Sequence, residues 1–276
     1  MGLRINTNIA SQEVQRNLRA SNALQEAEFS KLSSGKRINK SADDAAGLAI
    51  ANKLEAETRG LRMATRNAND AISMVQTAEG GLNETSNILT RLRELSIQSA
   101  SDSMSDQDRG YLALEYDQLV QEADRISKTT SFNGRQLLSG KGEVLQFQVG
   151  AFSGDDNLIE IDSSLSDASS ESLGLSGTNV RDKSDALDNL ERIDTAIGKV
   201  SAYRANFGSL QSRLTSTINN LDVAVVNQES ARSRIQDTDI AESTAKLASA
   251  QIKIAAGSAT LVQANALGNS ALRLIG

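Results

Sequence analysis

The side chains that most enzymes use for chemistry are missing from this sequence. Its 276 residues include no histidine and no cysteine. Without an imidazole base or a thiol, no Ser–His or Cys–His nucleophile pair can form, and a zinc site would lack its usual ligands. Carboxylates alone could still act as acid and base. We expect no catalytic, cofactor-binding or metal-ligating residue, and we do not expect an enzyme.

One basic cluster resembles part of a phosphate-binding loop. Lys36, Arg37 and Lys40 lie just after Gly35. The phosphate-binding motif would also need glycine at position 30, where this chain has Ser30. The cluster is therefore interpreted as a solvated charged face or as a source of ion pairs between subunits of an assembly.

Charge and hydropathy exclude two classes of partner. The formal net charge is −6 and the pI about 4.9, with both signs interspersed along the chain. Such a chain lacks the basic field that nucleic-acid binding relies on. No apolar run reaches the roughly 18 residues that span a membrane, and the segment 1–6 has no features of a cleaved signal peptide. We expect no nucleic-acid partner, no membrane insertion and no cleaved signal.

Two seams of apolar residues at heptad spacing predict the architecture. The first seam is Leu54, Leu61, Ala68, Val75, Leu82 and Leu89, and the second is Ala186, Ile193, Val200, Phe207, Leu214 and Leu221. Heptad spacing keeps one stripe of each helix against its partner as the helices wind left-handedly around each other. The chain also has no proline, which would interrupt long helices. Two seams far apart in sequence predict a rod in which the chain folds back on itself.

The remaining elements are arranged around these seams. Helices are expected over 1–33, 45–99, from 106 onward, over 183–235 and from 240 to the end, with Ser41 and Asp44 in a capping box before the second. Alternating residues predict a β-hairpin at about 143–163. The predicted fold is mainly α: an elongated rod of long antiparallel coiled-coil helices, with a small β-hairpin region and paired terminal helices.

The last helix has an unusual composition. It keeps the heptad spacing with Leu247, Ile254 and Leu261, and no Asp or Glu occurs from Ser243 to the end. A helix with an apolar stripe and so few charges is poorly suited to stand alone in water. It is either a core helix of a compact domain or a segment that packs against many copies of itself, with Leu247, Ile254 and Leu261 facing only neighbouring copies.

Several short motifs resemble bacterial flagellin. They cover essentially the whole chain, and together they are specific. The motifs are the segments 3–8 (LRINTN), 32–39 (LSSGKRIN), 42–50 (ADDAAGLAI), 93–95 (REL), 132–134 (FNG), 148–150 (QVG) and 235–239 (IQDTD).

The resemblance implies a structural subunit that polymerises into the flagellar filament for swimming. It assigns residues 1–44 and 239–276 to terminal helices of the inner core, and 45–238 to an outer-core rod domain. The short 163–177 stretch implies a minimal type without variable outer domains. It also implies an extracellular location, export without a cleaved signal peptide, and as partners other flagellin subunits, an export chaperone, the secretion apparatus, the filament cap and the hook-associated proteins.

The family resemblance also implies a surface patch for lateral contacts and for the flagellin-sensing Toll-like receptor of animals. Matched residue by residue, the patch is Arg91, Leu95 and Glu115, and an antiparallel return of the chain could bring Glu115 beside Arg91. The family's usual Gln before the arginine is Thr90 here. The alternative role of these residues is packing between subunits only.

One alternative function shares the terminal-helix plan: a hook–filament junction adaptor, which is present in few copies. The motifs at 34–50 and 235–239 favour the bulk filament subunit.

Overall fold

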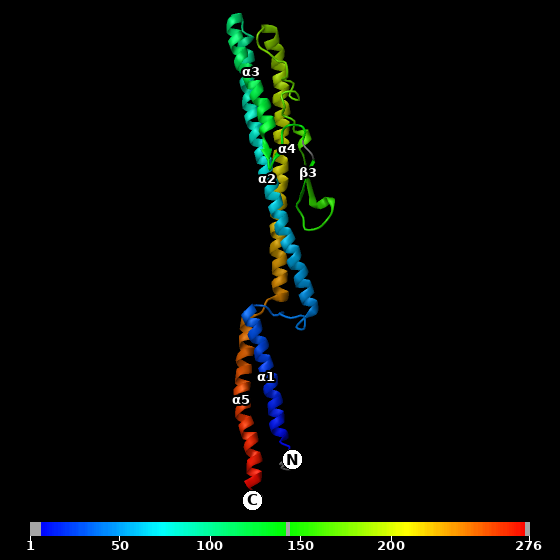
Figure 1. Ribbon diagram of the computed structural model, residues 1–276, viewed down its shortest axis with the longest axis vertical. Coiled ribbons are helices and arrows are strands. Elements are labelled where there is room, and N and C mark those ends of the chain that lie inside the picture. The colour runs from blue at the N-terminus through cyan, green and yellow to red at the C-terminus, as the bar shows by residue number, and fades with distance from the viewer. Residues whose placement is uncertain (1–6, 142–143, 274–276) are drawn as a thin grey trace. The chain divides into compact units, whose positions relative to one another are not determined.

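The computed structural model describes residues 7–141 and 144–273, and its contacts divide the chain into two compact units. Unit 1 combines Met1–Ala56 with Asn227–Gly276, and unit 2 is Glu57–Val226. The helices are α1 (Ile9–Ser34), α2 (Ala45–Ser99), α3 (Asp106–Thr129), α4 (Lys183–Gln236) and α5 (Ile240–Arg273) (Figure 1). The strands are β1 (Ser131–Phe132), β2 (Arg135–Gln136), β3 (Val144–Gln148) and β4 (Leu158–Asp162), and two 3₁₀ turns are η1 (Asp155–Asn157) and η2 (Ser163–Leu165).

Unit 2 is built on the two predicted seams. Leu61 of α2 packs in one cluster with Leu221 of α4, whereas Arg93 near the end of α2 pairs with Asp194 near the start of α4. The two helices are therefore antiparallel. Every member of the second seam is buried, and so is every member of the first except Leu54, which is partly buried. The predicted long antiparallel coiled-coil helices are confirmed.

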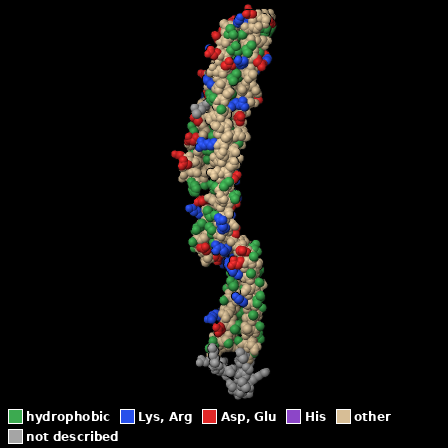
Figure 2. Space-filling view, turned by 180° about the vertical axis from the view of Figure 1, so that it is seen from behind, with side chains coloured by type: hydrophobic (Ala, Val, Ile, Leu, Met, Phe, Trp, Pro, Cys, Tyr) green, Lys and Arg blue, Asp and Glu red, His purple; other side chains and the backbone are tan. Residues whose placement is uncertain are grey.

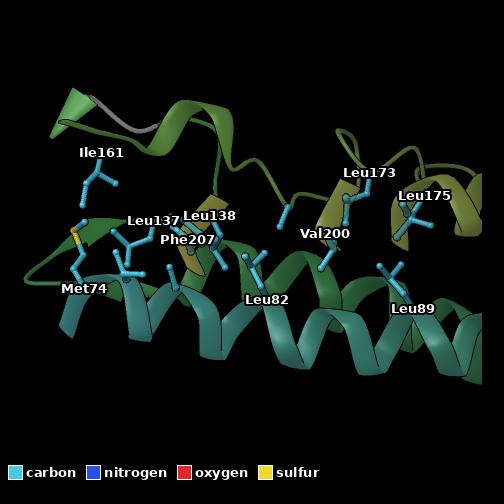
Figure 3. Packing of buried hydrophobic residues seen from close by; sticks show 14 of the residues in the cluster. Met74, Leu82, Leu89, Leu137, Leu138, Ile161, Leu173, Leu175, Val200 and Phe207 are labelled. Atoms are coloured by element: carbon cyan, nitrogen blue, oxygen red, sulfur yellow. The ribbon is translucent and has the colours of Figure 1, made fainter. Parts of the chain in front are cut away.

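Further segments cover the α2–α4 pair and complete the core of unit 2. Figure 3 shows Leu82 and Leu89 of α2 directed toward Val200 of α4 and toward side chains of the loops beside it. The fully buried Tyr116 of α3 donates its hydroxyl hydrogen to Thr178 Oγ1 at 3.1 Å. Burial of each large apolar side chain contributes about 1.5–3 kcal/mol, so this continuous core is the main source of the unit's stability.

The β-hairpin is confirmed at its predicted position. Strands β3 and β4 are antiparallel, with Val144 opposite Asp162 and Gln148 opposite Leu158. Ile159 and Ile161 face inward, because alternate residues of a strand point to one side. A second small sheet, β1 with β2, was not predicted; it closes on Asn133 and Gly134, both with positive φ, the latter at 78°.

The start of α2 differs from the prediction. The capping box was expected to use Ser41, but Asp44 Oδ1 accepts the Gly47 N–H at 2.8 Å and so caps the helix. Asp43 instead accepts the N–H groups of Asn39 and Lys40, at 3.0 and 2.9 Å. These bonds hold the chain in a turn, because a carboxylate that follows a loop can satisfy several free backbone donors. Sequence spacing alone did not show that Asp44 acts as the cap in place of Ser41.

In unit 1, α1 and α5 lie side by side (Figure 1). At one end Asn8 donates to the Ala264 carbonyl at 2.9 Å, and Ser11 donates to Asn265 Oδ1 at 2.9 Å. The predicted pairing of the terminal helices is present. The two compact units divide after Ala56 and Val226, so the first turns of α2 and the last turns of α4 belong to unit 1. The expected division of tasks at 44/45 and 238/239 stays a prediction.

Replacing Leu82 with Ala should destabilise unit 2 by about 2–5 kcal/mol, because the side chain is fully buried and its removal leaves a cavity. The matched control is Leu114→Ala, since Leu114 is 61% exposed and the change should stay within about 0.5 kcal/mol. Urea unfolding followed by circular dichroism measures both. Equal midpoints for the two variants would contradict the assigned core.

Candidate assembly surfaces

The first candidate surface joins α2 to α3 through Arg91. Its Nε donates to Glu115 Oε1 at 2.9 Å, and its Nη1 donates to Glu94 Oε2 at 3.0 Å. All three side chains are roughly half exposed. The hydrogen bond to Glu115 raises the pKa of the Arg91 guanidinium most, and the hydrogen bond to Glu94 raises it further. The expected contact between Arg91 and Glu115 is present, and both remain accessible to a partner.

The third residue of the expected patch lies elsewhere. Leu95 is 0% exposed and belongs to the main core of unit 2. It follows the buried Leu89 and Leu92 on the inward face of α2, so it supports the patch by packing and cannot itself touch a partner. Its expected place on the surface is corrected accordingly.

Exposed apolar side chains nearby were missed from the sequence. Tyr111 and Leu114 of α3 are 63% and 61% exposed, and Ile97 of α2 is 50% exposed. On α3 the residues turned toward the core include Ala113, Tyr116 and Ala123, with Leu112 and Leu119 packed beside them. Tyr111 and Leu114 lie outside this contact and are therefore available to a partner.

The second candidate surface is the α1–α5 pair. Leu247, Ile254 and Leu261 are partly buried, and they alternate with the buried Ser243, Ala250 and Ala264 along the α1-facing side of α5. Because α1 lies along that side of α5, these three residues are partly covered within the chain, and their role in contacts with neighbouring copies stays a prediction. The strongly exposed apolar side chains of α5 are instead Ile240, Ile252 and Val262, at 64%, 69% and 71%. Figure 2 shows hydrophobic side chains along the visible face of this pair (Figure 2).

A glycine of α5 lies against a leucine of α1. A Cβ at Gly257 would meet Leu18 Cδ2 at 2.9 Å and Cγ at 3.1 Å. These distances are shorter than a normal carbon–carbon contact, so a larger residue there would require the Leu18 side chain to shift.

A buried carboxylate lies between the same helices. Glu28 of α1 is 2% exposed and accepts a hydrogen bond from Lys31 Nζ at 2.8 Å. This bond lowers the pKa of the Glu28 carboxyl from its ordinary value of 4.5; burial opposes the shift, and Ser243 and Lys246 of α5 add to it. The ionised form is therefore the one that fits between α1 and α5.

The basic cluster does not form a phosphate loop. Arg37 donates from Nη2 to the Ile235 carbonyl at 2.6 Å, and its backbone N–H donates to the Gln236 carbonyl at 2.7 Å. Lys36 forms an antiparallel β-bridge with Asp237. Arg37 thus holds together the two segments that lead into α2 and out of α4.

Within residues 7–141 and 144–273, no group of three or more acidic residues could hold a metal ion. No helix in the same part of the chain is long and apolar enough to cross a membrane. What these surfaces offer is contact area and ion pairs, which suits a self-assembling structural protein.

Comparison with known proteins gives the same class. Residues 5–143 match the model of the bacterial flagellin N-terminal helical region, and residues 190–275 match the C-terminal helical region. A flagellin of Halalkalibacterium halodurans is 41% identical over 98% of this chain and 99% of its own. A flagellin of Bacillus subtilis is 37% identical over 99% and 100%, and a flagellar filament core protein of Brachyspira hyodysenteriae is 38% identical over 98% and 99%.

The solved structures agree with the sequence matches. The crystal structure of Bacillus cereus flagellin superposes with a TM-score of 0.51 at 33% identity, covering 56% of this chain and 88% of that one. The protein is thus a helical, self-assembling structural protein of the flagellum. The chain belongs to the bacterial flagellin family.

Membership in this family settles several expectations. The protein is a structural subunit that polymerises into the flagellar filament, and it is not an enzyme. The full-length matches favour this function over the hook–filament junction alternative. The short chain fits a minimal flagellin, since only residues 163–182 lie between β4 and α4.

We expect acid to weaken the α1–α5 pair through Glu28. Because its folded pKa is lowered, its contribution to stability is present above the ordinary value of 4.5 and is lost as pH falls through the lower folded value. Glu28→Gln filaments should therefore lose less stability than wild-type filaments between pH 6 and pH 3.5. Thermal melting of filaments, followed by circular dichroism, measures the difference. Parallel pH curves for the two proteins would contradict this role of Glu28.

Proposed function

We propose that unit 1 and unit 2 have different tasks in the filament, with the terminal helices 1–44 and 239–276 in the inner core and 45–238 in the outer core. The observation that carries this proposal is the composition of the α1–α5 contact. The buried residues of these helices in the described part of the chain are Ser11, Glu28, Ser243, Ala250 and Ala264. No large apolar side chain is among them, and the larger residues on the α1-facing side of α5, Leu247, Ile254 and Leu261, are only partly buried, so burial within one chain contributes less per residue than in the core of unit 2.

Exposed apolar side chains complete this argument. Ile9 and Phe29 of α1 are 56% and 58% exposed, and Ile252 and Val262 of α5 are more exposed still. Ordering a chain segment costs roughly 1–2 kcal/mol per residue. Contacts of these side chains with neighbouring subunits would offset that cost, and head-to-tail contacts that do not close produce an open helical polymer.

The partners follow from the same proposal. We further propose that the terminal helices become ordered only on assembly, so that the subunit stays monomeric before export. We propose that it binds an export chaperone, passes through the flagellum's own secretion apparatus without a cleaved signal peptide, and assembles outside the cell beneath the filament cap, beyond the hook-associated proteins.

Deleting α5 from Ile240 onward should abolish polymerisation and leave unit 2 folded. Unit 2 has its own core from Ala68 to Leu214, which this deletion does not touch. Seeded polymerisation observed by electron microscopy measures assembly, and the thermal midpoint of the monomer provides the control for folding. Long filaments from the truncated chain would overturn the inner-core assignment of α5.

The Arg91–Glu115 pair has a second proposed role, in lateral packing and in binding the animal Toll-like receptor that senses flagellin. The pair supports this role because it is exposed, links two helices and presents the flat guanidinium fork that suits a partner's carboxylate or carbonyl groups. The family's usual glutamine before the arginine is Thr90 here, so the affinity of this chain for the receptor should differ from that of relatives with glutamine.

Arg91→Ala and Glu115→Ala should weaken receptor signalling by the monomer and also impair swimming, without changing the monomer's unfolding midpoint. Arg93→Ala is the matched control, because Arg93 has similar exposure but pairs with Asp194 of α4. Leu95→Ala should instead lower stability by about 2–5 kcal/mol, since its side chain is fully buried. Unchanged signalling by the Arg91 and Glu115 variants would contradict the receptor role, and normal swimming would contradict the lateral role.

A further inference from the structure

The connection between β3 and β4 is longer and more ordered than a hairpin needs. Hairpin loops commonly have about 2–5 residues, whereas this one runs from Val149 to Asn157. The Val149 N–H donates to the Asn157 carbonyl at 2.8 Å. Gln148 Nε2 donates to the carbonyls of Gly150 and Phe152, at 2.9 and 2.7 Å. The loop is therefore preorganised, which lowers the entropy cost of binding a partner.

This loop presents an aromatic ring beside two carboxylates. Phe152 is 59% exposed, and Asp155 and Asp156 are exposed. Neither aspartate has an ion pair with any residue that the structure describes. Arg213 of α4 lines the groove beside Asp156, so the surface is not uniformly negative. A ring next to unpaired carboxylates is suited to a partner that offers apolar area next to basic groups.

A pocket with two basic side chains lies on the same unit, near the other end of the hairpin, and the carboxylate of Asp167 lies next to it at Gly140. It encloses about 400 Å³ and is lined by Arg135, Lys141, Ser139 and the edge of Leu145. Arg135 and Lys141 are exposed and, like the two aspartates, have no ion pair among the described residues. The buried hydroxyl of Ser139 has no hydrogen-bond partner in the described structure. Val144, the first residue of β3, is 50% exposed and provides apolar area beside the pocket.

Within one chain, the loop and the pocket lie at separate levels of α2. Gly60 of α2 lies against Ala151 of the loop, and Gly81 of α2 lies against Leu138, next to the pocket. At a rise of ~1.5 Å per residue, the stretch of helix from Gly60 to Gly81 spans roughly 30 Å. A loop therefore cannot reach the pocket of its own chain. The loop would, however, lie beside the pocket of a second copy if that copy were shifted by the same roughly 30 Å along unit 2.

We propose that the 150–157 loop of one subunit docks into the Arg135–Lys141 pocket of a neighbouring subunit, with the two copies displaced by roughly 30 Å along the axis of unit 2. Asp155 and Asp156 pair with Arg135 and Lys141, and Phe152 packs beside Val144. The contact joins different surfaces of two identical chains, so it repeats from copy to copy without closing. It rests on the self-assembly of the family and involves neither the terminal helices nor the Arg91–Glu115 pair.

A charge exchange tests the pairing. Asp155→Lys with Asp156→Lys should raise the critical concentration for seeded polymerisation by about tenfold or more, because like charges then face each other across the contact. Arg135→Glu with Lys141→Glu should do the same. The chain that carries all four changes should polymerise at nearly the wild-type concentration, since every contact then regains opposite charges.

Controls separate this contact from general charge effects. The variant Asp188→Lys with Glu191→Lys alters two exposed residues of α4 and changes the net charge by the same amount as the loop variant. When Arg135→Glu and Lys141→Glu are added to this control variant, the critical concentration should not return toward the wild-type value. Circular dichroism must show that every variant is folded. If the four-fold exchange assembles no better than the worse of its two parents, or if either parent assembles like the wild type, the proposed pairing is wrong.

Engineered cysteines provide a second test. The chain has no native cysteine, so no other disulfide can form. Ser153→Cys lies in the loop and Gln136→Cys lines the pocket. A disulfide needs Cα atoms within about 7 Å, so the pair cannot form within one chain. Oxidised filaments of the double variant should give a ladder of covalent oligomers in denaturing gels, and each single variant should not. Filaments that form normally but give no ladder would overturn the proposal even if the charge variants behave as expected.

Discussion

The packing of α2 against α4 is the interaction on which the rest of unit 2 depends. Small residues on α2, such as Ala68, Ala71 and Ala78, let the helices approach closely, and larger residues such as Phe207 of α4 fill the space between them. Interdigitated packing of this kind fixes register as well as stability. Helix α3, the hairpin and the ordered loops all cover one continuous apolar surface, so any surface for assembly is positioned by that core.

Unit 1 follows a different physical rule. Its helices meet through small residues, partly buried leucine and isoleucine side chains and the buried carboxylate of Glu28, which accepts a hydrogen bond from Lys31. A buried charge is costly when it loses its partners, so Glu28 favours one register of the pair. Ser243 and Lys246 of α5 favour the ionised form of Glu28, so a slipped pairing of α1 and α5 would leave that carboxylate without them. A helix pair that is specific in register but weakly stabilised is appropriate for a segment that becomes ordered together with its neighbours.

The elements that follow a regular sequence pattern could be predicted from the sequence. The heptad seams were identified because their periodicity extends over many residues, and the hairpin because residues alternate along both of its strands. The cap at Asp44 and the β1–β2 sheet depend on single contacts, which no periodic pattern reveals. Leu95 continues the inward face of Leu89 and Leu92, whereas the family resemblance implied a place in the surface patch. The apolar stripe of Leu247, Ile254 and Leu261 shows that one side of α5 is covered, but not whether the same chain or another copy covers it.

Burial within the single chain separates the residues that fold a filament subunit from those that assemble it. A residue buried in one chain, such as Leu95, is constrained by folding, whereas an exposed residue without an intramolecular partner is available for assembly. Four exposed charges, Asp155, Asp156, Arg135 and Lys141, have no ion pair within the described part of the chain and fall on two surfaces of opposite sign. Exposed ion pairs contribute little each, but a contact repeated along a polymer adds its small contribution at every subunit. Weak contacts of this kind can hold a filament together while a single subunit remains monomeric.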